Sequence, residues 1–255
     1  DPVQPTASVT EPTPTTDPEL SPEPSSEPSP EPTPEPSPEP SPVPTPSGPW
    51  YQAALDFACD HRILLGDPSG NMMPNDNATR AQMAAMLVRV FGCTASKDIA
   101  HFTDVSTTAW YYSELSTAAQ MNIFNGYGDG TMGPNRSITR QEAMVVIARA
   151  FAVPDGTAAD IVNGDNGSLY PTASITRAEI AQMLYNLGLQ FCSDAAALPA
   201  SGRVIYTGAT PLTADAFTGT LYLGGPAGRD LGGMNITGTL VVRTDPNGTV
   251  TVGGT

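Results

Sequence analysis

The sequence is poor in the residues that most catalytic and metal sites use. Its 255 residues include two histidines, three cysteines and two tryptophans, and 11 Lys and Arg against 26 Asp and Glu. No run of about 18 apolar residues occurs, so we expect no membrane insertion. Cys59, Cys93 and Cys192 lack metal-site spacing, and an odd number of cysteines cannot be fully paired. We expect them to be free, buried, small apolar side chains.

Catalysis is poorly supported by the remaining residues. His61 and His101 are isolated from any cysteine or serine signature, and a structural role is the simpler interpretation. The sequence contains no Gly-x-Ser-x-Gly elbow, no His-Glu-x-x-His motif and no P-loop. We therefore predict no enzyme activity, no catalytic residues, no cofactor and no metal site.

The negative charge is concentrated at the N-terminal end. Residues 1–49 hold 18 of the 27 prolines, nine acidic residues and no Lys or Arg, which leaves 17 acidic and 11 basic residues elsewhere. Nothing in the chain resembles a basic stripe, so we expect no nucleic-acid partner. Arginines can still bind an anionic polymer locally, because salt screens charges over roughly 8 Å under physiological conditions.

Residues 1–48 form a low-complexity segment of Pro, Ser and Glu. Six of its glutamates, from Glu19 to Glu39, recur every four residues. Proline restricts φ and like charges repel, which favours an extended, disordered, polyproline-II-like spacer. Such a spacer could hold a second module away from a crowded surface.

Three later segments share one pattern, which ends in a Thr-Arg pair. In each segment a glycine lies ten residues before the arginine and a proline lies six residues before it. The residues are Gly70, Pro74, Thr79, Arg80 and Gln82; Gly130, Pro134, Thr139, Arg140 and Glu142; and Gly167, Pro171, Thr176, Arg177 and Glu179. The threonine and the Glu or Gln have capping-box spacing, so each arginine should open a helix. Apolar residues at i, i+3, i+4 and i+7 predict one buried face on each helix.

An arginine at the first helical position is unfavourable with respect to the helix dipole, by a few tenths of a kcal/mol. Beside free amides and a glycine loop, it could instead form half of an anion site. The alternative is that Arg140 simply points into water.

A first helix precedes two of the three loops. Trp50 and Trp110 each lie 30 residues before the arginine, and they open helix-like runs at 50–64 and 109–123. In the third copy the interval between arginines shortens from 60 to 37 residues, and no tryptophan is present. We expect its first helix to be missing or reduced to residues 157–162.

Residues 198–255 alternate apolar and small residues, which is typical of strands. Thr218–Leu221 recurs as Thr237–Leu240 after 19 residues. We predict strands at 204–206, 221–223, 240–242 and 250–252, arranged as the opening turns of a β-solenoid. This β-rich segment is either the start of a larger module or a small β-sheet appendage.

The second copy carries a more specific signature. Phe102–Val105, Trp110, Gly126–Gly130, Pro134 and Ile138–Glu142 together resemble the S-layer homology (SLH) motif, and the third copy has the related pentapeptide Ile175–Glu179. The resemblance covers residues 49–192, as repeats 49–93, 99–152 and a truncated 153–192. It implies a mainly α fold of helix-loop-helix repeats in a pseudo-threefold bundle, followed by the β segment.

The resemblance also implies a function. SLH motifs anchor exported proteins noncovalently to the wall of Gram-positive-type bacteria, by binding pyruvylated secondary cell-wall polysaccharide, a polymer linked to peptidoglycan, in grooves between motifs. The protein is then secreted and held at the cell surface, in or near the S-layer. The ligand-binding residues implied are Arg80, Arg140, Arg177, Trp50, Trp110, Asp104, Gly126, Tyr127, Gly128, Asp129 and Gly130. The shortened third copy puts one groove in doubt.

Three alternatives remain open from the sequence. Asp129 and Asp165 could bind Ca²⁺, although an EF-hand-type loop needs more acidic positions than Gly126–Gly133 offers. The degenerate repeats could act only as a structural adaptor between the spacer and the β segment. Finally, a C-terminal β module could carry polysaccharide-degrading activity, an inference from fold analogy alone.

Overall fold

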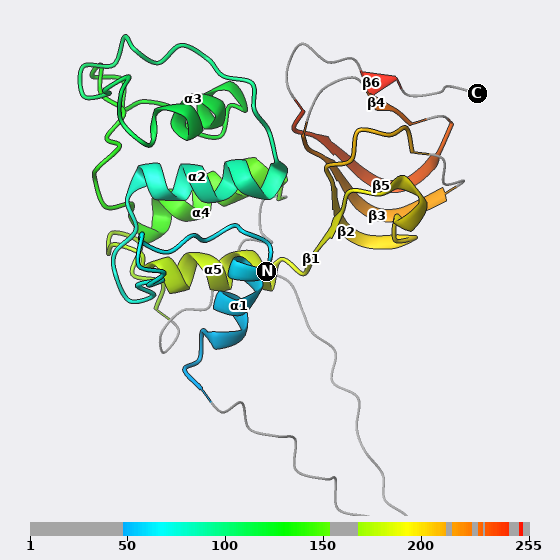
Figure 1. Cartoon of the computed structure of the whole chain (residues 1–255), viewed down its shortest axis with the longest axis horizontal. Coiled ribbons are helices and arrows are strands. Elements are labelled where there is room, and N and C mark those ends of the chain that lie inside the picture. Colours follow the sequence, from blue (N-terminus) through cyan, green and yellow to red (C-terminus); the bar gives the residue numbers. More distant parts are fainter. Residues whose placement is uncertain are drawn as a thin grey trace, which may run out of the picture. The chain divides into compact units, whose positions relative to one another are not determined.

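The chain was analysed as a computed structural model (Figure 1). The structure describes residues 48–153, 168–212, 216–225, 229–231, 233–244 and 250–251. Residues 46–255 form one structural unit, separate from residues 1–45. Apart from Gly48, the predicted spacer lies outside the described residues. The shortened helix predicted at 157–162 and the glycine of the third loop also lie outside them.

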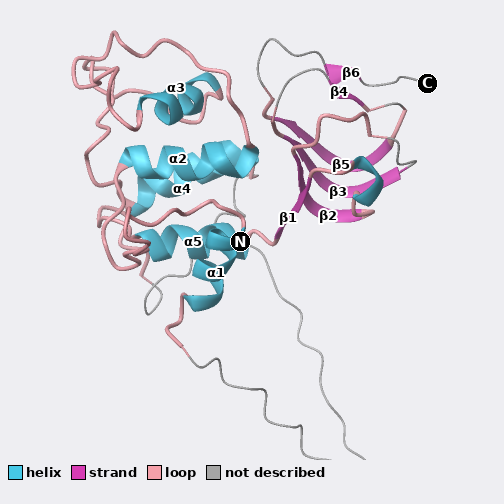
Figure 2. Cartoon of the chain, viewed as in Figure 1, coloured by secondary structure: helices cyan, strands magenta, loops and turns pink. Residues whose placement is uncertain are grey.

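The described part of the chain contains five α-helices, shown in cyan in Figure 2. Three are the predicted capped helices: α2 (Arg80–Phe91), α4 (Arg140–Phe151) and α5 (Arg177–Asn186). Each follows a threonine whose side chain accepts from the third helical amide, while the Glu or Gln accepts from the threonine amide. All three capping boxes predicted from the sequence are therefore confirmed.

The two first helices are shorter than the sequence pattern predicted. They are α1 (Gln52–Asp60) and α3 (Tyr112–Gln120), so Trp50 and Trp110 lie in the turns before the helices rather than inside them. Soon after each helix ends, Arg62 and Asn122 adopt the left-handed conformation, with φ of 55° and 56°. Apolar residues continue just beyond this point, as Ile63 and Leu64 in one repeat and Ile123 and Phe124 in the other, which is why the pattern alone extended both helices too far.

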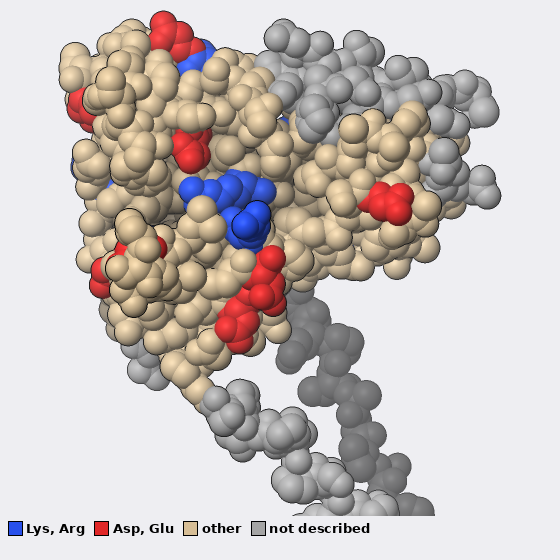
Figure 3. Space-filling model, in the orientation of Figure 1, with Lys and Arg blue, Asp and Glu red and all other residues tan. Residues whose placement is uncertain are grey.

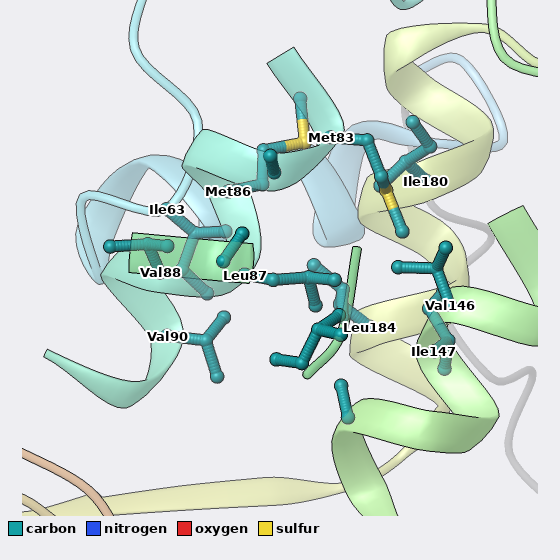
Figure 4. Packing of buried hydrophobic residues seen from close by; sticks show 14 of the residues in the cluster. Ile63, Met83, Met86, Leu87, Val88, Val90, Val146, Ile147, Ile180 and Leu184 are labelled. Atoms are coloured by element: carbon teal, nitrogen blue, oxygen red, sulfur yellow. The ribbon is translucent and has the colours of Figure 1, made fainter. Parts of the chain in front are cut away.

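The capped helices meet in one hydrophobic cluster (Figure 4). The figure shows side chains of α2, α4 and α5 pointing toward one another, among them Leu87, Ile147 and Leu184. These three residues are at most 1% exposed. The first helices join the same cluster: α1 packs on α5, and α3 packs on α2. Each of these first helices therefore covers the capped helix of a different repeat.

A closed ring of backbone hydrogen bonds connects the three repeats just before their capped helices. The amide of Ile138 donates to Ala78 (2.9 Å), that of Ile175 to Ile138 (3.0 Å), and that of Ala78 to Ile175 (2.9 Å). Because each repeat donates to one neighbour and accepts from the other, the order of the repeats around the ring is defined. This order decides which loop each arginine can reach.

A parallel four-stranded sheet follows α5, in the order β1-β2-β3-β5. Its strands are β1 (Leu189–Cys192), β2 (Ser201–Tyr206), β3 (Ala216–Leu223) and β5 (Asn235–Val242); between the first two lies the short helix η2 (Ala195–Ala197). A second, two-stranded parallel sheet pairs β4 (Arg229–Asp230) with β6 (Val250–Thr251).

The predicted strands lie within β2, β3 and β5, and β6 covers the first two residues of the fourth. Thr218 pairs with Thr237, as the 19-residue repeat predicts. The sequence analysis missed β1, which begins two residues after Leu187 at the end of α5. A four-residue strand that directly follows a helix has too short a pattern to separate it from the helix.

The sheet also contacts the ends of two capped helices. Ile205, Tyr222 and Val241, from three neighbouring strands, join the helical hydrophobic cluster. The Tyr222 hydroxyl donates to the carbonyl oxygen of Phe151, the last residue of α4 (3.1 Å). The amide of Gly225 donates to the carbonyl of Phe91, the last residue of α2 (2.6 Å). The β segment is thus packed against the helical repeats rather than joined to them only through the chain.

Candidate functional site

Arg80 reaches into the glycine loop of the second repeat. Its side chain is buried, and the residue is 5% exposed. Nε donates to the carbonyl of Met132 and Nη2 to that of Asn125, both at 3.0 Å. The guanidinium carbon lies 4.4 Å from the centre of the Tyr127 ring and 5.3 Å from that of Phe124. The cation therefore holds the two ends of the loop together.

Glu142 faces Arg80 across the boundary between the repeats. Its Oε1 lies 3.6 Å from Nη1 of Arg80 and accepts from the Tyr127 hydroxyl (2.9 Å), while its Oε2 accepts from the Thr139 amide (2.9 Å). Burial alone would raise the pKa of Glu142, but these hydrogen bonds and the Arg80 charge together lower it below its usual value. The capping carboxylate is thus shared between a helix start, a tyrosine and a cation.

The other two arginines repeat this relationship around the ring. Arg177, also 5% exposed, donates to Met72 (2.8 Å) and Leu65 (2.7 Å) in the first repeat. Arg140 donates to Leu169 (2.8 Å) in the third repeat and forms an ion pair with Glu179. The sequence equivalent of Glu142 and Glu179 in the first repeat is Gln82, so the capping-box residue there is neutral, and the carboxylate that interacts with the Arg177 charge is Asp76.

Two expectations for the arginines need correction. The Arg140 side chain does not simply point into water, because it is 11% exposed and donates to Leu169, and Arg80 and Arg177 are buried as well. Nor does an arginine lie against the loop of its own repeat: the Gly126–Gly130 loop is met by Arg80 from the preceding repeat rather than by Arg140. The ring order, which local sequence cannot show, brings each arginine to the next loop.

The loop itself is braced by two aspartates. Asp104 accepts from the amides of Met132 (2.8 Å) and Gly133 (2.7 Å), and Asp129 accepts from the Thr131 amide (2.9 Å). Their oxygens thus bind the loop backbone. Among the described residues, no group of three or more His, Cys, Asp or Glu is placed to hold a metal ion. Asp165, the second residue of the calcium alternative, lies outside them.

The structure favours glycine at three positions of this loop, for different reasons. A side chain on Gly126 would collide with the ring of Phe102, so close packing requires glycine there. Gly128 and Gly130 have φ of 80° and 85°, which favours glycine, and the space around both is open. Both residues are exposed, and the carbonyl of Gly130 accepts from the Thr103 amide (3.0 Å).

A cavity of about 280 Å³ opens between this loop and α4. It brings together Arg80, Gly126 and Tyr127 of the predicted site. Its lining also includes Gln141, Glu142, Val145, Val146 and Arg149 from α4, with Ile123, Phe124 and Asn125. The sequence analysis did not single out Arg149. A signal was available, since Arg149 follows Arg140 by nine residues, as Arg89 follows Arg80.

The two tryptophans do not line this cavity. Trp50 is 66% exposed and Trp110 is 59% exposed. Each lies edge-on to the next residue, Tyr51 or Tyr111, with ring centres 5.3 and 5.8 Å apart. They are therefore open to solvent at the start of the first helices, and the structure does not bring them to Arg80.

Charge on the described surface is local rather than extended. On the face shown in Figure 3, the largest group of basic side chains lies near the centre, with acidic side chains above and below it, and smaller basic areas appear at the edges. No helix among the described residues is long and apolar enough to cross a membrane.

Comparison with known proteins gives the family. The S-layer homology domain model matches residues 45–84, 101–144 and 156–181. The chain is 31% identical over 98 residues to a surface-layer 125 kDa protein of Lysinibacillus sphaericus, covering 38% of this chain. It is 34% identical over 88 residues to a cellulosome-anchoring protein of Acetivibrio thermocellus, covering 33% of this chain.

Several other relatives carry enzyme names. An amylopullulanase of Thermoanaerobacterium thermosulfurigenes is 25% identical over 167 residues, or 54% of this chain. The matched regions are small parts of these proteins: 8% of the surface-layer protein, 20% of the cellulosome-anchoring protein and 9% of the amylopullulanase. The three matched segments of this chain belong to the S-layer homology domain family.

Proposed function

We propose that this chain anchors an exported protein to the bacterial cell wall by binding an anionic polysaccharide in the grooves between its SLH motifs. SLH motifs are noncatalytic anchoring elements, and the surface-layer and cellulosome-anchoring relatives support a location at the cell surface. The observation that carries the proposal is the cavity between the Gly126–Gly130 loop and α4, which combines cations, loop backbone and apolar side chains.

Within this proposal, the polymer is a secondary cell-wall polysaccharide that carries pyruvate ketals. Arg80, Arg140 and Arg177 shape the grooves by holding each loop in place. The exposed loop backbone at Gly128 and Gly130 can hydrogen-bond to sugar oxygens, while Asp104 and Asp129 keep the loop in shape. Trp50 and Trp110 contact the polymer outside the cavity, where their exposed rings can pack against sugar faces.

The groove arrangement follows from a pseudo-threefold order of the motifs, which the ring of hydrogen bonds among Ala78, Ile138 and Ile175 supports. One charge-assisted hydrogen bond contributes about 1.5–3 kcal/mol, so a single groove binds modestly. Several grooves on one polymer chain raise the overall affinity without new contacts. The groove at Arg140 includes the shortened third repeat and is the one most affected by the shortening.

Two other functions are separable from this one. A purely structural adaptor would pack the same repeats without binding a glycan. A polysaccharide-degrading enzyme would place catalysis in the β segment, and the amylopullulanase relative is the observation that keeps this candidate open. The SLH match lies in the helical repeats, so it supports anchoring rather than catalysis.

The test is co-sedimentation of the full chain with purified cell walls, before and after the secondary polymer is removed chemically. Anchoring predicts sedimentation with intact walls and its loss with stripped walls. Equal sedimentation with both preparations would contradict the polysaccharide proposal, and no sedimentation with either would favour the adaptor. Release of reducing sugar from the walls by this chain would favour the enzyme.

A further inference from the structure

Two arginines line the cavity, and one of them, Arg149 on α4, has no carboxylate partner among the described residues. Its side chain lines the cavity and is exposed. Within the part of the chain that the structure describes, no hydrogen bond or ion pair of its guanidinium is found. Arg80, the other cation, already has Glu142 opposite it at 3.6 Å. The cavity thus contains two cations and one carboxylate, and Arg149 supplies the excess positive charge.

In the first repeat, the arginine equivalent to Arg149 has a carboxylate partner. Arg89, the equivalent residue on α2, pairs with Glu114 of α3 (3.7 Å) and donates to the carbonyl of Ile63 (3.4 Å). Helix α3 packs on α2 there, and Ala85 is buried as a result. The equivalent of Ala85 on α4 is Val145, which is 41% exposed and lines the cavity. Among the described residues, no neighbouring helix supplies the equivalent carboxylate at α4.

The carboxyl end of α4 does not neutralise Arg149 either. Helix C-termini carry partial negative charge, which attracts cations within the last turn. Here Arg243, which follows β5, donates to the carbonyls of Ala150 (2.9 Å) and Arg149 (2.5 Å). Those carbonyls are thereby occupied, and the Arg149 guanidinium is left available to a ligand.

We propose that Arg149 binds the carboxylate of one acidic sugar residue in this cavity and so selects charged over neutral saccharides, an inference that rests on the anchoring function proposed above. A guanidinium pairs with a planar carboxylate through two parallel hydrogen bonds. Gln141 offers amide groups for hydroxyls, and Val145 and Val146 offer an apolar wall for the carbon face of the sugar. The volume is near the lower end of ligand pockets, about 300 Å³, which suits one sugar unit.

The net excess of one positive charge favours a singly charged carboxylate. A dianionic phosphate would meet the carboxylate of Glu142 as well as the two arginines, and like charges at short range are unfavourable. Uronic acids and pyruvate ketals share the carboxylate, so the probes must separate these two sources. We use methyl glucoside as the neutral reference, with its 4,6-pyruvate ketal, the corresponding glucuronide and the 6-phosphate as charged probes.

The experiment titrates each probe into the full chain and follows arginine Nε–Hε and valine methyl resonances by NMR. We expect the carboxylate probes to shift Arg149 and Val145, and Arg149→Ala to weaken their binding roughly 10- to 100-fold. Arg149→Lys should recover part of the affinity. Val145→Glu places a carboxylate one turn from Arg149 and should also abolish binding, whereas Val145→Gln should not.

Two control variants separate the local role from general charge. Arg136→Ala removes an exposed cation whose guanidinium carbon lies 4.5 Å from the centre of the Tyr127 ring, and it changes the net charge equally. Arg89→Ala removes the equivalent cation of the first repeat. Both should bind the carboxylate probes within about twofold of the unmodified chain.

Wall co-sedimentation distinguishes failure of this inference from failure of the anchoring function. If the unmodified chain sediments with walls and Arg149→Ala sediments equally well, the assignment of Arg149 is wrong and anchoring stands. Equal affinity for the neutral glucoside, or preference for the 6-phosphate, would also overturn it. If the unmodified chain binds neither walls nor probes, both proposals fail.

Discussion

Arg80 and Glu142 lie 3.6 Å apart across the boundary between the first and second repeats, and each begins or caps a helix in its own repeat. The pair sits at the end of the glycine loop, where Tyr127 donates to the same carboxylate. A helix cap and a contact between repeats therefore share one side chain. Disturbing it should affect both local helix stability and the shape of the groove.

Replacing Arg177 should destabilise the whole unit. Its guanidinium holds the carbonyls of Leu65 and Met72 in a buried setting, and these acceptors would lose their donors. We expect Arg177→Ala to lower the free energy of unfolding by about 2–4 kcal/mol, measured by urea denaturation. Arg177→Lys should restore less than half, because an ammonium cannot donate along both directions.

The matched control for this variant is Arg149→Ala, since that side chain has no hydrogen bond among the described residues. It should change the unfolding free energy by no more than about 0.5 kcal/mol. Similar losses for the two variants would show that Arg177 does not hold the loop.

Glu142 should contribute to the loss of stability in acid. Its pKa is lowered in the folded chain, so its contribution is complete above the unfolded pKa, about 4.3, and is lost as the pH falls through the lower folded pKa. The difference in unfolding free energy between the unmodified chain and Glu142→Gln should therefore shrink between pH 6 and pH 3. Urea unfolding at several pH values measures it. A constant difference across this range would contradict the prediction.

Tyr222 should couple the sheet to α4. Tyr222→Phe keeps the ring between Phe91 and Phe151 and removes only the hydroxyl that donates to the Phe151 carbonyl. We expect a loss of about 1–3 kcal/mol, because a buried acceptor is left without a donor. Tyr112→Phe removes an exposed hydroxyl 3.3 Å from Asp98 and should have little effect. Equal melting temperatures for the two variants would show that the contact is not stabilising.

Gly219 should be required for strand pairing. A side chain there would collide with the carbonyl oxygen of Gly202 on the neighbouring strand, and its φ of 124° is strained for other residues. Gly219→Ala should therefore cost more than Gly233→Ala, where φ is 91° and the space is open. Thermal unfolding followed by circular dichroism compares them. A larger loss for Gly233→Ala would place the close approach of the strands in doubt.

Sequence patterns predicted the elements whose causes are local. A Thr cap with a Glu or Gln three residues later favours a helix start, and the capped helices begin at Arg80, Arg140 and Arg177 as expected. The Thr-Gly-Thr repeat likewise predicted the register between Thr218 and Thr237, because residues in successive rungs of a parallel sheet stack in order.

Relationships between repeats could not be read from the sequence in the same way. That Arg80 meets the loop of the second repeat depends on the ring order, which is a property of the folded chain. The lack of a carboxylate partner at Arg149, among the described residues, is recognised only by comparison with Arg89, whose carboxylate partner comes from α3. The role of Trp110 in ligand binding was implied by the SLH resemblance and stays a prediction, although the residue does not line the cavity next to Arg80.

The contacts of Gly225 and Arg243 with the ends of α2 and α4 have a mechanical consequence. A load applied to the chain beyond β5 would not swing freely about the two-residue connection between α5 and β1. The parallel strands would instead carry this load in shear and transmit it to α2 and α4 through the contacts of Gly225 and Arg243. Under the anchoring function proposed above, a load on β5 would therefore reach the helical repeats through the sheet and not only through a flexible connection.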